Sequence, residues 1–157
     1  MNSRIPDYAG GSLLNLMAEL EHRLTGSAPA RRLHAHLADH ISAADTYVLV
    51  LFDGLGDHQL EHPGAAPLRN ARVDALDAVF PTTTSVNLAT IATGLAPATH
   101  GLIAHQLYVP ATGQVVNTLK WGTPWGTPVQ VDHGSFLPKP NLWERLRLHF
   151  SLEGAKP

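Results

Sequence analysis

Residues 46–52, TYVLVLF, form an uninterrupted apolar run that ends on Asp53, and Gly54 and Gly56 follow closely. Such a run is typical of a strand that is buried on both faces of a parallel sheet. Open α/β sheets build their ligand sites at the carboxyl ends of such strands, and glycines allow a sharp turn and a close approach. This stretch alone is consistent with a ligand or metal at Asp53 and equally with a simple Asx-type turn.

The other segments alternate between helical and extended patterns. Helices are expected over five segments: residues 12–24, 31–43, 57–62, 85–95 and 141–150. Ser12 and Gly26 are the expected cap and stop signals of the first helix. A second short strand is expected near the end of residues 71–80, and a β-hairpin over residues 105–121. Residues 122–140, rich in proline and glycine, predict an extended loop. This order of elements predicts an α/β domain.

The composition narrows the functional class. The 157 residues carry a formal net charge of -2 and no basic run with interleaved aromatic residues, so nucleic-acid binding is not expected. The absence of cysteine excludes disulfides and thiolate metal sites. No apolar run reaches the ~20 residues that a membrane span needs, and Glu19 and Glu21 interrupt the apolar residues near the N-terminus. We therefore expect a cytoplasmic protein that does not bind membranes.

Residues 80–101, FPTTTSVNLATIATGLAPATHG, carry the strongest chemical signal. Thr84 lies at the expected start of a helix, where the helix dipole and free backbone N–H groups stabilise an alkoxide or a bound anion. Asn87 follows three residues later on the same face, and an amide beside a nucleophilic hydroxyl can hold a developing oxyanion. Helix capping by Thr84 is the competing interpretation, because threonine is a favoured N-cap residue.

Together with VLVLFDGLG, this segment resembles the type I phosphodiesterase/nucleotide pyrophosphatase branch of the alkaline phosphatase superfamily. That branch has a strand ending in Asp-Gly, then Phe-Pro-Thr/Ser-x-Thr with Asn three residues after the last Thr, then Thr-Gly-x-x-Pro-x-x-His-Gly. The chain has the corresponding residues in the same order: Asp53-Gly54, Phe80 to Thr84, Asn87, and Thr93 to Gly101. The resemblance covers residues 6–121 and is clearest over 46–108. A threonine at the nucleophile position and the lack of a Cys-x-Pro-x-Arg segment argue against the alkaline phosphatase branch proper and the sulfatase branch.

The resemblance implies a partial alkaline phosphatase-like sandwich, in which a mostly parallel sheet is flanked by helices and the β-hairpin is an insertion. It implies that Asp53 is a ligand of one zinc ion. It also implies that Thr84 is a metal-activated nucleophile that forms a phospho-threonine, and that Asn87 holds a non-bridging phosphate oxygen. Two zinc ions about 4 Å apart, or another divalent metal, would activate the attacking oxygen and stabilise the leaving one. The implied substrate is a small phosphodiester or nucleotide, and the oligomeric state stays open.

The domain expectation is that residues 1–157 are the N-terminal part of a single catalytic domain of this kind. The family draws further Asp and His ligands from a C-terminal half that has no counterpart here, and two groups cannot fill two tetrahedral zinc shells. We therefore expect a zinc-dependent hydrolase of phosphodiester or pyrophosphate bonds that is incomplete in this chain. The alternative is a catalytically inactive remnant or a small phosphate- or metal-binding α/β domain.

The ten histidines suggest other metal sites. HQLEH, residues 58–62, fits the H-x-x-E-H pattern of inverted zinc proteases. Pro63 and Gly64 would end that helix early, so we interpret it as an exposed helical turn. His36 and His40 share a face of the second expected helix, and without an acidic partner at matching spacing we interpret them as a solvated face.

Overall fold

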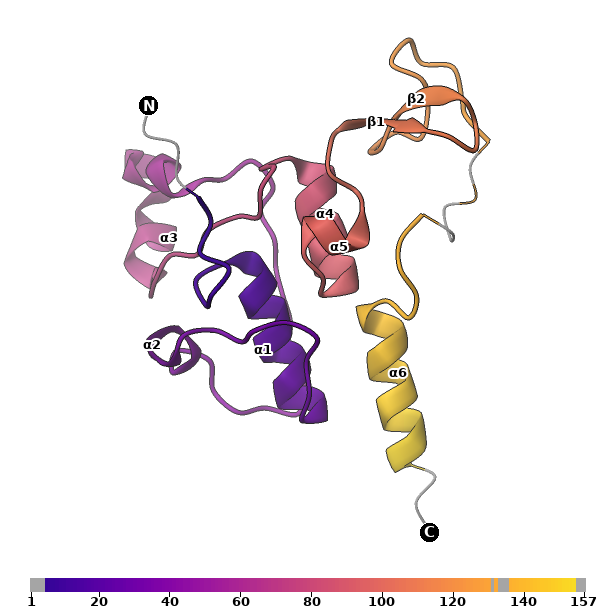
Figure 1. The fold of residues 1–157 in the computed structure, drawn as a ribbon. Helices are drawn as coiled ribbons and strands as arrows, with labels where there is room; N and C mark the ends of the chain where they lie inside the picture. Colours follow the sequence, from indigo (N-terminus) through magenta and orange to yellow (C-terminus); the bar gives the residue numbers. More distant parts are fainter. Residues whose placement is uncertain (1–4, 131, 133–135, 155–157) are drawn as a thin grey trace.

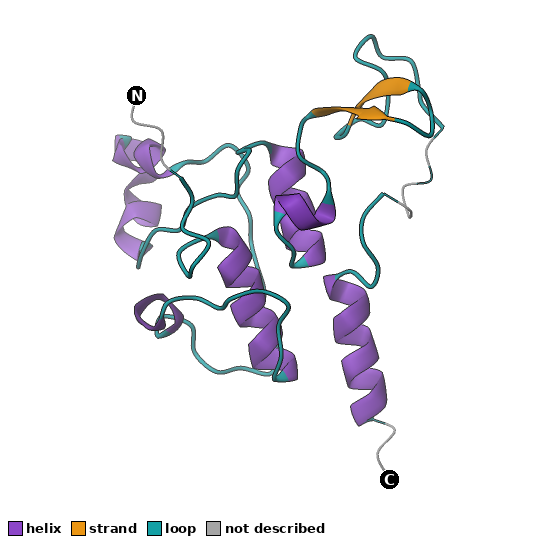
Figure 2. Cartoon of the chain, in the orientation of Figure 1, coloured by secondary structure: helices purple, strands orange, loops and turns teal. Residues whose placement is uncertain are grey.

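The computed structural model describes residues 5–130, 132 and 136–154. These residues form helices and one β-hairpin, joined by long loops (Figures 1 and 2). The longer helices are α1 (Leu13–Thr25), α4 (Thr84–Thr93) and α6 (Leu142–Glu153). The shorter helices are α2 (Ala35–Ala38), α3 (Ala66–Ala71), α5 (Pro97–His100) and the 3₁₀ helices η1 (Asp57–Glu61) and η2 (Pro63–Ala65). No helix in the described ranges is both long and apolar enough to cross a membrane.

The first predicted helix is confirmed as α1, and local signals fix both of its ends. Ser12 is the N-cap residue, and its backbone N–H and hydroxyl both donate to Oδ1 of Asn15, at 3.0 and 2.6 Å. At the other end, Gly26 adopts a φ of 78° and donates its N–H to the carbonyl of His22 at 2.7 Å. Glycine is favoured at this position because a positive φ is strained for residues that carry a Cβ atom.

The core lies where α1 packs against α4. Five buried apolar side chains form it: Leu14, Val79, Val86, Ala89 and Leu102. The predicted helix over residues 85–95 is confirmed as α4, which begins one residue earlier, at Thr84. The helix ends at Thr93, and Gly94 follows it with a φ of 65°. α4, which carries Thr84 at its start, therefore packs against both α1 and α6.

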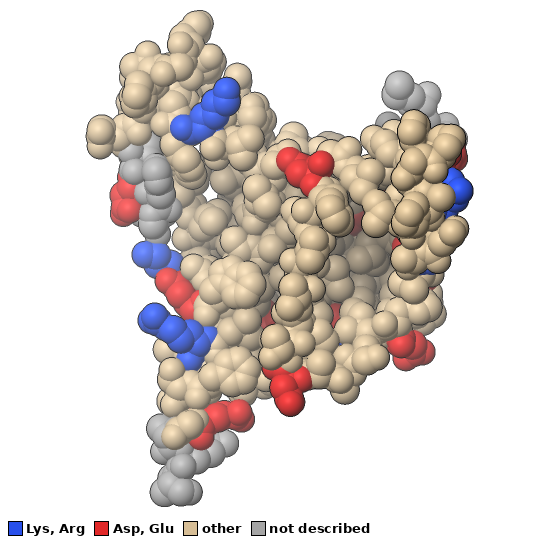
Figure 3. Space-filling model, turned by 180° about the vertical axis from the view of Figure 1, so that it is seen from behind, with Lys and Arg blue, Asp and Glu red and all other residues tan. Residues whose placement is uncertain are grey.

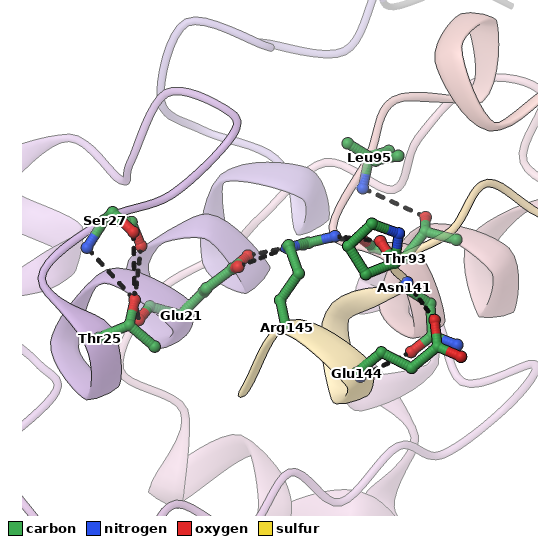
Figure 4. A network of polar contacts seen from close by, with 9 residues as sticks. Glu21, Thr25, Ser27, Thr93, Leu95, Asn141, Glu144 and Arg145 are labelled. Carbon is green, nitrogen blue, oxygen red and sulfur yellow. Dashed lines mark hydrogen bonds and ion pairs between the residues drawn. The ribbon is translucent and has the colours of Figure 1, made fainter. Parts of the chain in front are cut away.

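Arg145 fastens α6 to the other two long helices (Figure 4). Its Nε and Nη2 donate to the two carboxylate oxygens of Glu21 on α1, at 2.6 and 2.8 Å, and Nη2 also donates to the carbonyl of Thr93 at 2.9 Å. The predicted helix over 141–150 is confirmed, and a capping box starts it: Asn141 and Glu144 accept each other's backbone N–H at 3.0 and 2.8 Å.

The predicted hairpin is confirmed as the antiparallel pair β1 (Gln106–Val109) and β2 (Gln114–Asn117), in which Leu107 lies opposite Val116. In Figure 1 the hairpin lies above and to the right of α4 and α5. The following segment, residues 122–140, has no helix or regular strand in its described part, in agreement with the predicted loop. Positions 131 and 133–135 of that segment lie outside the described residues.

The prediction of a paired, buried strand over residues 46–52 is wrong. The segment is extended, but no described segment forms a backbone ladder with it, and its side chains are largely exposed. A strand needs a neighbour at hydrogen-bonding distance, and that neighbour cannot be read from the strand's own residues. The mostly parallel sheet that the family resemblance implies is therefore not formed by the described residues.

Three other expected elements are shorter than predicted. The helix expected over 31–43 is reduced to α2, because the carbonyl of Arg31 accepts from Asn15 Nδ2 at 2.8 Å and the N–H of His34 donates to Gly10 O at 3.0 Å. These bonds compete with helical ones. The strand expected near the end of 71–80 is a single bridge between Asp77 and Ser12. The helix expected over 57–62 is the 3₁₀ helix η1, and α3 was not predicted at all.

Candidate active site

The structure brings Thr84 and Asp53 together, although 31 positions separate them in the sequence. Thr84 is the first residue of α4, and Asp53 ends the extended segment 46–52. The Thr84 hydroxyl donates toward both carboxylate oxygens of Asp53, at 3.3 Å each. Gly54 has a φ of 74°, so the chain turns sharply just after the carboxylate. The competing interpretation of Thr84 as a helix cap is wrong, because Thr83 occupies the N-cap position.

A cleft of about 540 Å³ surrounds this pair. Its apolar wall comes from α1, α4 and the two extended segments: Leu13, Leu51, Phe52, Leu55, Leu76 and Leu88. Its polar wall includes Asp53, Gln59, Asp77, Thr84 and Asn87. No Lys, Arg or His from the described part of the chain lines it. Among the residues that the structure describes, the lining of the cleft therefore includes two carboxylates and no basic side chain.

Asn87 lines the cleft beside Thr84, and its amide is already bonded to the preceding loop. Oδ1 accepts the backbone N–H of Val79 at 3.2 Å, and Nδ2 donates to the carbonyl of Thr83 at 3.0 Å. One amide hydrogen is left over, because an asparagine NH₂ carries two donors. Asn87 thus ties the loop of residues 79–83 to α4, and this loop sets where Thr84 lies.

Sequence reasoning missed two residues of the cleft, Gln59 and Asp77. A Cβ atom on Gly56 would lie 2.8 Å from Oε1 of Gln59, so any other residue at position 56 would require the Gln59 side chain to shift. The carboxylate of Asp77 accepts the backbone N–H of Asp7 at 3.0 Å. The expected strand near the end of residues 71–80 continues past Asp77, so strand-end position did not mark this residue as it marked Asp53. Gln59 had no sequence signal either.

The described residues do not fit a two-zinc centre. No group of three or more His, Cys, Asp or Glu side chains that could hold a metal occurs among them. Asp53 and Thr84 are the two candidate ligands that the geometry brings together, whereas zinc in proteins takes about four ligands. The pair can supply part of one metal shell.

The other histidine candidates do not form metal sites within the described ranges. His58 lies within the 3₁₀ helix η1 and His62 directly follows it, and the three-residue turn of such a helix does not align positions i and i+4. His62 also accepts the N–H of Gly64 at its Nδ1, at 3.0 Å. His36 and His40 do not share a helix face, because α2 ends at Ala38. The protease interpretation therefore has no structural support.

His100 is a buried structural residue near the end of this region. It is 2% exposed, its Nδ1 accepts the N–H of Leu102 at 3.1 Å, and its Nε2 lies 3.2 Å from the Thr90 hydroxyl. Acceptance at Nδ1 assigns the proton of the neutral ring to Nε2. Burial lowers the pKa of His100 to about 4 and outweighs a backbone hydrogen bond that acts in the opposite direction.

Comparison with known proteins gives one positive result. The sequence model of the type I phosphodiesterase / nucleotide pyrophosphatase family matches residues 47–151, about two thirds of the chain. No curated protein and no solved structure matches significantly. The matched range contains both Asp53 and Thr84.

Proposed function

We propose that this chain, which belongs to the type I phosphodiesterase / nucleotide pyrophosphatase family, takes part in the hydrolysis of phosphodiester or pyrophosphate bonds of small nucleotide-type molecules. Thr84 is the nucleophile of this proposal. The observation that carries it is the direction of the Thr84 hydroxyl, which points at the Asp53 carboxylate from the first residue of α4. A threonine hydroxyl needs such a partner, because it is a weak nucleophile at neutral pH.

The proposed first step is attack of Thr84 Oγ1 on phosphorus. The Oγ1–P bond forms, the bond from phosphorus to the leaving oxygen breaks, and the leaving alcohol or phosphate departs in line with the attack. Asp53 accepts the hydroxyl proton that Thr84 releases. Backbone N–H groups in the first turn of α4 stabilise the negative charge on the non-bridging oxygens, because a helix N-terminus favours anions. Water then hydrolyses the phospho-threonine and restores the hydroxyl.

The proposal includes a divalent metal, with zinc as the ion that the family resemblance implies. The support is electrostatic: the Asp53 carboxylate lies beside the Thr84 hydroxyl, so an anionic phosphodiester at Thr84 meets a like charge that a cation would offset. Asp53 and Thr84 would hold part of the shell of one ion, which would supply that charge when bound. The described residues do not supply a second ion's ligands.

The incomplete donor set favours a second candidate function. In that alternative, the chain binds phosphate or a divalent ion at the start of α4 without turnover. Asp53 and Thr84 suffice for weak binding, whereas a tetrahedral zinc centre needs more ligands than this pair offers. The two candidates differ in whether the hydroxyl of Thr84 becomes covalently phosphorylated.

The deciding experiment measures zinc binding and the hydrolysis of bis(p-nitrophenyl) phosphate by the purified chain. Under the first proposal, Thr84→Ala and Asp53→Asn each lower turnover at least about 100-fold, and Thr84→Ser retains part of it. Thr99→Ala, an exposed threonine outside the cleft, is the matched control and leaves turnover unchanged. Zinc or phosphate binding that Asp53→Asn weakens, with no turnover in any variant, would replace the first proposal by the second.

A further inference from the structure

Asp53 is followed directly by Gly54, and this is the only position in the sequence where an aspartate or asparagine precedes a glycine. In such a pair, the backbone nitrogen of the glycine can attack the side-chain carbonyl carbon of the residue before it. Glycine permits this attack best, because it carries no Cβ atom that hinders the approach. The proposed function makes no use of this chemistry, although Asp53 is one of its central residues.

Exposure to solvent does not by itself distinguish Asp53 from other aspartates. Figure 3, which views the molecule from behind, shows acidic side chains at several separate places on the surface. The exposed aspartates include Asp39, Asp45, Asp53, Asp57 and Asp74. Of these, Asp53 precedes glycine, whereas the others precede histidine, threonine or alanine. The residue that follows Asp53 is therefore what sets it apart.

The fold leaves the backbone nitrogen of Gly54 accessible. Gly54 is exposed and lies outside the helices and strands. Its φ of 74° belongs to a turn, and a Cβ atom built on it would meet nothing within 4 Å. Among the described residues, no acceptor receives the N–H of Gly54. Attack by this nitrogen therefore requires no hydrogen bond between described residues to break.

The carboxyl group of Asp53 is also held weakly. Its two oxygens accept from the Thr84 hydroxyl at 3.3 Å each, whereas a strong O–H···O hydrogen bond measures about 2.8 Å. Asp57, a few positions along the chain, has a charged partner instead, since Arg72 lies 3.1 Å from its carboxylate. The Asp53 carboxyl group can therefore rotate toward the Gly54 nitrogen at little cost in free energy.

We propose that Asp53 is a site of spontaneous isomerisation to isoaspartate in the folded chain. The Gly54 nitrogen forms a bond to Cγ of Asp53, and one carboxyl oxygen leaves as water together with the amide proton. The product of this step is a succinimide ring. A second water molecule then opens the ring at the former backbone carbonyl, so that the main chain runs through Cβ and Cγ. The two steps release one water and consume one, and they need no other reactant.

The isomerisation changes the candidate active site. In isoaspartate the free carboxylate is attached directly to Cα, and the main chain gains a methylene group before Gly54. The carboxylate therefore moves away from the Thr84 hydroxyl that it contacts in the structure. The loss of this contact follows whatever reaction the pair supports, so the inference goes beyond the proposed function and does not depend on it.

The test follows isoaspartate in the purified chain during incubation in warm neutral buffer with a chelator, after circular dichroism has shown that the chain is folded. The probe is an endoprotease that cuts before aspartate but not before isoaspartate, so isomerisation leaves residues 45–56 as one uncut peptide. Asp53 should convert at least about tenfold faster than the exposed Asp45, which precedes a β-branched threonine. Equal conversion at the two positions would overturn the proposal.

A synthetic peptide of residues 45–61 shows whether the fold protects the site. The folded chain should convert at Asp53 within about fivefold of the rate in this peptide, because an unrestrained segment opens at little cost. A folded chain that reacts more slowly than this limit would mean that the fold shields the Gly54 nitrogen, and the proposal would be wrong.

Two asparagine variants give an independent readout by mass. Asp53→Asn reacts through the same ring and loses ammonia, so each conversion adds the mass difference between an amide and a carboxyl group. Asp45→Asn is the matched control, because it is also exposed but precedes threonine. Asp53→Asn should gain this mass at least about tenfold faster than Asp45→Asn. Equal rates in the two variants would contradict the assignment of Gly54 as the attacking residue.

Discussion

Arg145 on α6 and Glu21 on α1 form a two-point ion pair across 124 positions of the sequence (Figure 4). The side chains of Arg145 and Glu21 are 21% and 4% exposed, so the contact is largely removed from water. The same guanidinium donates to the carbonyl of Thr93 at 2.9 Å and of Pro140 at 3.0 Å. One side chain therefore joins three long helices, α4 through its last carbonyl, and α4 carries Thr84 at its other end.

We expect Arg145→Ala to lower the free energy of unfolding by about 3 kcal/mol, because it leaves the buried Glu21 carboxylate without its partner. Arg147→Ala removes an exposed arginine from the same helix and should change stability by less than about 0.5 kcal/mol. Urea unfolding of both variants measures the difference. A double-mutant cycle with Glu21→Gln then isolates the pair, and a coupling near zero would contradict the assignment.

Asn87 provides a second prediction, since its side-chain amide is hydrogen-bonded to the backbone of Val79 and of Thr83, at the two ends of the loop 79–83. Asn87→Ala leaves the N–H of the fully buried Val79 without an acceptor and should cost about 2 kcal/mol of stability. Asn70→Ala, at an exposed asparagine on α3, is the matched control. If Asn87→Ala unfolds at the same urea concentration as the wild type, the amide does not have this structural role.

His100 makes stability depend on pH. Its pKa is about 4 in the folded chain, below the ordinary value of about 6.5 that the unfolded chain has, so the unfolded state binds the extra proton between these values. The stabilisation is complete above pH 6.5 and is lost as the pH falls toward 4, by up to about 3 kcal/mol.

The measurement for His100 is urea unfolding at a series of pH values between 7 and 4. His100→Gln should flatten the profile in this window, because glutamine does not titrate. His58→Gln, at an exposed histidine, should leave the profile unchanged. An unchanged slope in His100→Gln would mean that other groups cause the acid sensitivity.

Elements whose boundaries depend on local signals were predicted correctly, whereas features that depend on long-range contacts were not. Ser12 and Gly26 bound α1 as predicted, and Asn141 bounds α6, because caps and stop signals act within one turn. The hairpin follows from its own turn residues in the same way. Family resemblance, rather than spacing, singled out Asp53 and Thr84 as members of one site, and the structure places them in contact.

Long-range partners account for what sequence reasoning missed. Asn15 donates a hydrogen bond to the carbonyl of Arg31, and this bond competes with the helix expected there. The sequence pattern of residues 31–43 does not reveal that competition. The strand at 46–52 has the right residues but no described neighbour. The contact between Glu21 and Arg145 has no local signature, because the two residues belong to helices at opposite ends of the chain.

Two glycines give the last prediction, because they share a backbone conformation and differ in their surroundings. Gly26 and Gly94 follow α1 and α4 with φ angles of 78° and 65°. Around Gly26 an added Cβ meets nothing within 4 Å, whereas at Gly94 it would lie 2.9 Å from Arg145 Nη2 and 3.3 Å from Glu21 Oε2. Gly26→Ala therefore carries the backbone cost alone, about 1 to 2 kcal/mol.

Gly94→Ala should cost more than Gly26→Ala, since the methyl group also displaces the ion pair. Urea unfolding of the two variants gives the difference between their free energies of unfolding. This difference measures the cost of displacing the ion pair between Arg145 and Glu21. In an Arg145→Ala background the clash with the guanidinium is absent, so the two alanine variants should become nearly equal. If Gly94→Ala is no more destabilising than Gly26→Ala in the wild-type background, the ion pair does not pack against Gly94 as the structure has it.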